Sequence, residues 1–212
     1  MPVSDDRFSR DLRRYNLALR MLRLAARPNT IRAWTGLSRQ RVRSLLRAYR
    51  YAAAQPVAGV LRGPSPTRFA SLLADANLRR ELTAMAGWCR ILGVIPPEAV
   101  SNARHRLPNV ATGERLCRAL ETFRSVVPHT RLTLEQLVLL VFALAEGQEW
   151  HLDHCIHCRA VILIDRLSVA GRVCMDCREE ASEREGRAVP PVSASSASVN
   201  TFGSPEAQQR LL

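Results

Sequence analysis

Two identical cysteine pairs constrain this chain more than any other feature of its sequence. Cys155 and Cys158 form one C-x2-C pair, and Cys174 and Cys177 repeat the spacing after fifteen intervening residues. A C-x2-C turn directs two thiolates at one ion, and two such turns complete a tetrahedral shell. Four sulfur ligands favour Zn²⁺, and a closed shell leaves no position for a reacting water. The spacing therefore predicts one structural Zn²⁺ per chain, held by these four cysteines.

The residues around the two pairs predict a small zinc ribbon over 150–183. The stretch RAVILIDR is rich in β-branched residues, LSVAG suits a turn, and RVC can lead back to the second pair. We therefore expect a hairpin that joins the two cysteine pairs. Three histidines, His151, His154 and His157, crowd the same region. Because the cysteine set is already complete, we expect them beside the metal site or exposed rather than as ligands.

The charge of the chain indicates an anionic partner. The formal net charge is +12, and every one of the 31 basic residues is arginine. The first fifty residues hold thirteen arginines and only three aspartates, so most of the excess lies in the first quarter of the chain. An excess of this size, concentrated in one region, most simply indicates nucleic acid as the partner.

The sequence also indicates a cytoplasmic protein without a membrane span. The first sixteen residues carry charges where a signal peptide needs an apolar stretch. The longest apolar run, 137–145, is about half of what a transmembrane helix needs. Thiols stay reduced in the cytoplasm, which favours metal ligation over disulfides. Cys89 and Cys117 have no partner at ligand spacing, and we expect them to be small core residues.

The sequence of residues 1–53 predicts helices arranged as in a helix-turn-helix. Apolar residues at helical spacing predict a first helix that ends before Pro28. Asn29 or Thr30 is expected to cap a short second helix, which Gly36 ends. Ser38 is expected to cap a third helix.

The third helix has one apolar and one polar face. Its apolar residues between 42 and 49 recur as a single buried stripe. The second helix of a helix-turn-helix lies in the major groove, where Arg can bind guanine and Gln adenine. The alternative is a solvated face of an ordinary helical hairpin, and the concentration of charge favours DNA. The candidate DNA-binding residues are Arg39, Gln40, Arg43 and Arg47.

The rest of the chain predicts a helical core between less ordered segments. Thr133 and Gln136 form a capping box for a helix over 134–145 that is apolar on nearly all sides and is therefore expected to be buried, either in this core or against a partner chain. Pro97 suits the start of a helix from Glu98. The expected class is mostly α, with helix-turn-helix-like N-terminal helices, a helical core and a small four-cysteine zinc ribbon. The expected regions are 1–53, a linker at 54–67, the helical core at 68–149, the ribbon at 150–183 and a disordered tail at 184–212.

These motifs together resemble the FlhC family, the C subunit of the bacterial flagellar master transcriptional activator. The resemblance covers about residues 10–180 and is carried by the L-S-R-x-R start of the third helix (37–41), the helical middle and the late four-cysteine cluster. It implies assembly with a small helical D subunit (FlhD) and binding to promoters of flagellar operons. It also implies recruitment of RNA polymerase, with the four cysteines matching the family's zinc ligands. Arg159 and Ala160 stand where the family tends to have glycine.

A DNA-binding transcriptional activator subunit is therefore the expected function. The alternative is a helical zinc-ribbon adaptor that binds RNA or an acidic protein partner. An enzyme is not expected, because a zinc deaminase needs a Glu in an H-x-E or C-x-E segment ahead of its cysteines. No such segment, Gly-rich phosphate loop or nucleophile elbow is present in the sequence.

Overall fold

A computed structural model describes residues 3–52, 68–95, 107–167 and 171–187. The predicted mostly helical class is confirmed, with one two-stranded sheet in the described residues and four cysteines that can hold a metal near the C-terminal end. The predicted linker, the predicted helix from Glu98 and most of the predicted tail lie outside the described residues. The elements are α1 (Val3–Arg23), α2 (Pro28–Thr35), α3 (Arg39–Ala52), the 3-10 helix η1 (Phe69–Ala74), α4 (Ala76–Ile91), α5 (Val110–Val126), α6 (Leu134–Glu146), β1 (Trp150–His154), β2 (Val161–Asp165) and α7 (Met175–Arg187).

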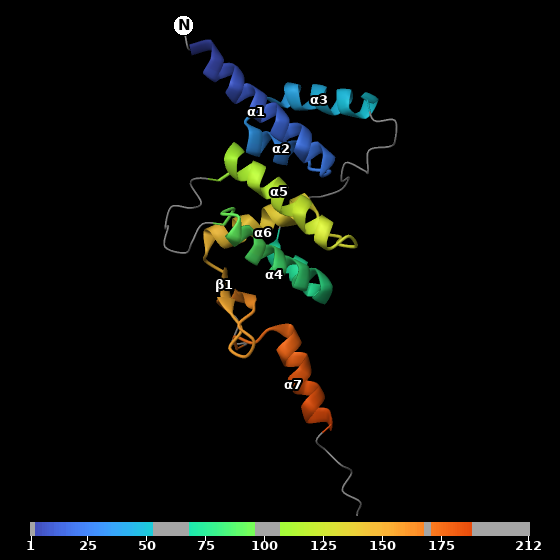
Figure 1. Cartoon of the computed structure of the whole chain (residues 1–212), viewed down its shortest axis with the longest axis vertical. Coiled ribbons are helices and arrows are strands. Elements are labelled where there is room, and N and C mark those ends of the chain that lie inside the picture. Colours follow the sequence, from blue (N-terminus) through green and yellow to red (C-terminus); the bar gives the residue numbers. More distant parts are fainter. Residues whose placement is uncertain (1–2, 53–67, 96–106, 168–170, 188–212) are drawn as a thin grey trace, which may run out of the picture. The chain divides into compact units, whose positions relative to one another are not determined.

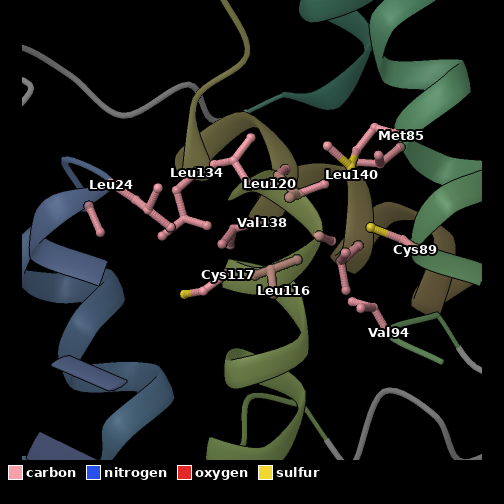
Figure 2. Packing of buried hydrophobic residues seen from close by; sticks show 14 of the residues in the cluster. Leu24, Met85, Cys89, Val94, Leu116, Cys117, Leu120, Leu134, Val138 and Leu140 are labelled. Carbon is pink, nitrogen blue, oxygen red and sulfur yellow. The ribbon is translucent and has the colours of Figure 1, made fainter. Parts of the chain in front are cut away.

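Within the described residues, the chain up to Cys174 forms one compact unit, and Met175 begins a second. In the first unit, α5 contacts α1 and α2 on one side and α4 and α6 on the other (Figure 1). Figure 2 shows Leu116 and Leu120 of α5 between Leu24 and the α4 residues Met85 and Cys89. Each of these side chains is almost completely buried. The N-terminal helices therefore share their core with the helical middle of the chain.

The N-terminal helices confirm most of the predicted order. Gly36 adopts the left-handed conformation (φ 68°) at the end of α2, which is the conformation that favours glycine at this position. Ser38 Oγ accepts a hydrogen bond of 3.3 Å from the backbone N–H of Arg41, as expected of the residue that caps α3. The predicted start of α2 was wrong. Pro28 is the first helical residue, since its fixed φ and missing N–H suit that position, and Arg27 precedes it at the N-cap.

The apolar helix predicted at 134–145 lies in the middle of this core. It contacts α4, α5, η1 and β1, and both bonds of the Thr133 and Gln136 capping box are present. Phe142 of α6 meets Trp34 of α2 with ring centroids 6.1 Å apart. The prediction that this helix is buried is confirmed, and its cover comes from this chain.

Gly113 marks the closest approach of α5 to the N-terminal helices. A Cβ at this position would lie 2.8 Å from Leu17 Cδ2 and 3.2 Å from Trp34 Cε3, and both side chains are almost fully buried. We expect Gly113→Ala to destabilise the protein, because overpacking costs about 1–3 kcal/mol and exceeds the gain of about 1 kcal/mol that Ala brings to a helix. The measurement is the free energy of unfolding in denaturant. Gly87→Ala is the control, because its Cβ would meet Val161 at an ordinary 3.8 Å. An equal gain in stability for both variants would contradict the close approach.

The strands form an antiparallel hairpin that packs on the helical core. Trp150 pairs with Asp165 at one end, and His154 pairs with Val161 at the other. The Trp150 ring meets Phe69 of η1 edge-on, with centroids 5.4 Å apart, and β2 contacts α4. The hairpin is therefore part of the first compact unit, although the boundary predicted at residue 150 separated it from the helical core.

Candidate metal centre and basic surface

The first cysteine pair lies at the tip of the hairpin. The predicted arrangement, a hairpin joining the two pairs, was wrong, because β1 and β2 lie on either side of Cys155 and Cys158. The Cys155 N–H donates to the Ala160 carbonyl (2.8 Å), and the Arg159 N–H donates to the Cys155 carbonyl (3.0 Å). These two bonds close a tight turn around the first pair.

Arg159 carries a backbone conformation that glycine adopts more readily. Its φ is +63°, in the left-handed region that costs a non-glycine residue roughly 1–2 kcal/mol. The turn after Cys158 thus keeps a glycine-like geometry with an arginine in place, and the exposed guanidinium adds a positive charge beside the cysteines.

The second cysteine pair spans the end of a short connecting segment and the first turn of α7. The Ile156 N–H donates to the Arg172 carbonyl (2.9 Å), and the Cys174 N–H donates to Cys155 Sγ (3.3 Å). Helix α7 starts at Met175, so Cys177 lies in its first turn. Helix α7 was not predicted from the sequence, and its last residues lie where a disordered tail from residue 184 was expected. The stretch after Cys177 could have predicted this helix, because it is rich in the strong helix formers Glu and Arg. Asp176 near the helix start is a further signal, because a negative charge is favourable at a helix N-terminus.

The four sulfur atoms lie close enough together to share one ion. All four Sγ atoms are within 4.8 Å of one another, and those of Cys158 and Cys174 are 3.6 Å apart. A tetrahedral site with Zn–S bonds of about 2.3 Å has sulfur atoms roughly 3.8 Å apart. The donor set and its spacing therefore fit a metal ion of the thiolate-binding kind.

The environment of Cys155 favours the thiolate, which is the form that binds a metal. Backbone N–H groups of Cys158 and Cys174 donate to its sulfur and lower its pKa to about 6, although burial acts in the opposite direction. Cys89 and Cys117 have the contrasting environment. Burial raises the pKa of each to about 12, so both stay protonated in the core, and their predicted role as small core residues is confirmed.

The three histidines near the cysteines lie outside the group of side chains that can hold a metal. His154 and His157 are exposed. His151 is half-buried, and its Nδ1 atom has no hydrogen-bond partner among the residues that the structure describes. Over the described ranges, the group of side chains that can hold a metal contains the four cysteines and no histidine.

The candidate DNA-binding residues all lie on the exposed side of α3. Val42 is buried, and the other apolar residues of its stripe pack partly buried against the core, as predicted. Arg39, Gln40, Arg43 and Arg47 are exposed. The structure also separates them, because Arg39 and Arg43 line a cavity shared with α2 whereas Gln40 and Arg47 do not.

Part of the N-terminal charge is neutralised within the fold. Arg13 of α1 binds both carboxylate oxygens of Glu114 on α5 (3.2 and 2.7 Å), and Arg20 binds both oxygens of Glu121. The hydrogen bonds that each guanidinium donates to its carboxylate raise the pKa of that guanidinium. Between residues 28 and 52, by contrast, the sequence has six arginines and no acidic residue. The unneutralised charge therefore concentrates on α2 and α3. Charge counting along the sequence does not show this, because it does not reveal which arginines meet a carboxylate from a distant part of the chain.

Comparison with protein-family models and with curated proteins gives no match for this chain. In the described segments, no helix is both long enough and apolar enough to cross a membrane.

Proposed function

We propose that this chain is a DNA-binding subunit of a transcriptional activator, and that α3 is its recognition helix. The observation that carries the proposal is the acid-free, arginine-rich exposed face of α3, which follows α2 through the Gly36 turn. The opposite side of α3 is anchored in the core through Val42. A recognition helix needs this combination of a fixed inner side and an exposed polar side.

The cysteine cluster supports the proposal as a structural element. We propose that it holds one Zn²⁺ per chain, bound by the two cysteine pairs. Four thiolates around one ion leave no open position for substrate, so the ion has no catalytic part in this proposal.

The resemblance to the FlhC family supports the rest of the proposed role. It favours a cytoplasmic subunit that acts with an FlhD-like partner at promoters of flagellar operons and brings RNA polymerase to them. A direct test is co-purification with an FlhD-like subunit, followed by zinc analysis and footprinting on a flagellar promoter at physiological salt. A zinc-loaded complex that protects one defined site supports the proposal. Zinc binding without a partner or a preferred site supports instead the adaptor that binds RNA or an acidic protein.

Replacing Gln40 and Arg47 together with alanine tests sequence reading by α3. Both side chains are exposed, so we expect the fold to remain and the affinity for the protected site to fall. A good bidentate contact to a base provides about 1–3 kcal/mol of discrimination, so the ratio of specific to random-duplex affinity should fall by roughly tenfold or more. The measurement is fluorescence anisotropy with both duplexes.

The control for this double variant is Arg118→Ala, which removes one exposed charge from α5. It should leave the affinity ratio unchanged. A Gln40→Ala, Arg47→Ala variant with the wild-type ratio would show that this face of α3 does not read bases.

A further inference from the structure

A cavity of about 570 Å³ lies between α2 and α3. Both helices contribute arginines to its wall, and no acidic residue lines it. Its apolar lining is confined to Pro28 and Val42, which is unlike the mostly apolar lining of small-molecule pockets. The lining residues are Arg27, Pro28, Asn29, Arg32, Arg39, Val42 and Arg43.

The arginines of this cavity contrast with those that α1 directs at α5. Arg13 and Arg20 each meet a carboxylate, whereas within the described ranges no ion pair links Arg32, Arg39 or Arg43 to an acidic side chain. Several guanidinium groups converging on one space repel one another unless an anion lies between them. A guanidinium presents a planar fork of N–H donors that matches the oxygens of a phosphate. The chemistry of the cavity therefore favours an anion with several oxygens, such as a phosphate group.

The walls of the cavity are fixed from behind by the core. Glu135 of α6 is buried and accepts hydrogen bonds from the Arg27 N–H and the Thr30 hydroxyl, both at 2.8 Å. Ile31 of α2 is completely buried and Val42 of α3 almost completely. Because α2 and α3 are both anchored in this way, the arginines extend from a preorganised frame.

We infer that this cavity binds a phosphate group of a nucleic-acid backbone, with α2 and α3 forming opposite walls. The source of the phosphate rests on the proposed DNA-binding function. The four candidate DNA-binding residues of α3 then have two different roles. Arg39 and Arg43 hold the backbone together with Arg32 of α2, and Gln40 and Arg47 remain for the base edges. The recognition surface thus includes α2, which the sequence did not identify as a binding element.

Arg32→Ala tests the cavity without altering α3. Loss of one phosphate contact should lower affinity by the same factor for the protected site and for a random duplex. The slope of log K against log salt concentration should fall in magnitude by about 0.9, as for one contact fewer. Arg39→Ala, on the opposite wall, should give the same pattern. Both are compared with Arg118→Ala, and circular dichroism verifies that each variant is folded.

The results of these measurements distinguish a failure of the cavity inference from a failure of the proposed DNA-binding function. If Arg32→Ala and Arg39→Ala keep the wild-type affinity and slope while the Gln40 and Arg47 variant loses its preference, the cavity inference is wrong and DNA binding stands. If the wild-type chain binds neither duplex, the proposed function and the nucleic-acid source are both wrong. In that case tripolyphosphate is the probe. If tripolyphosphate raises the unfolding temperature of the wild-type chain saturably and does not raise that of Arg32→Ala, the cavity is still a phosphate site. If tripolyphosphate does not stabilise the wild-type chain, the phosphate site is wrong as well.

Discussion

Replacing Cys174 with serine is expected to abolish stoichiometric zinc binding and to produce the largest loss of local structure of any single substitution considered. Cys174 supplies one of the four sulfurs, and serine has no sulfur to replace it. Bound zinc contributes about 10–16 kcal/mol of folding free energy in small zinc-finger peptides. The hairpin here also packs on the helices through Trp150 and Phe69, so we expect the helical core to persist while the hairpin tip unfolds.

Metal analysis of the purified chain and thermal unfolding with and without a chelator measure this effect. The wild-type unfolding temperature should fall with chelator, and that of Cys174→Ser should not respond. His157→Ala is the matched control, because His157 lies inside the first pair and is exposed. It should retain zinc. A Cys174→Ser chain that binds zinc with wild-type stoichiometry, or is equally stable without it, would contradict a structural four-cysteine site.

Replacing Glu135 with alanine is expected to give the second large effect, on both stability and DNA binding. The change removes the acceptor of the Arg27 N–H and the Thr30 hydroxyl. An unsatisfied donor costs about 1–3 kcal/mol when fully buried, and these two donors are part-buried, so the free energy of unfolding should fall by roughly 1–3 kcal/mol. Since the same bonds fix the start of α2 beside the arginine-lined cavity, affinity for specific and random duplexes should fall together.

Denaturant unfolding and duplex titration on the same preparation measure the two effects. Glu149→Ala removes one exposed carboxylate and should change stability by no more than about 0.5 kcal/mol. Unchanged stability of Glu135→Ala would mean that the two donors find other partners. Lost stability with unchanged duplex affinity would mean that the position of α2 does not matter for binding.

The features that the sequence predicted correctly depend on neighbours within a few residues. The capping box of Thr133 and Gln136, the Ser38 cap and the left-handed Gly36 are all local, because each is set by backbone bonds within one helical turn. The cysteine cluster was also predictable, because each pair acts within a single turn and two pairs suffice for one ion. The buried stripe of α3 follows from helical periodicity for the same reason.

The sequence by itself thus determined the helical class, the helix ends with local caps and the four cysteines that can hold a metal. The tertiary structure decided which charges are neutralised and which are left to bind, since Arg13 and Glu114, like Arg20 and Glu121, are about a hundred residues apart in the chain. It also placed the hairpin around the first cysteine pair and divided the α3 arginines between a cavity and an outer face. The physical reason is that these features depend on how separate elements pack, whereas residue spacing reports only the periodicity within one element.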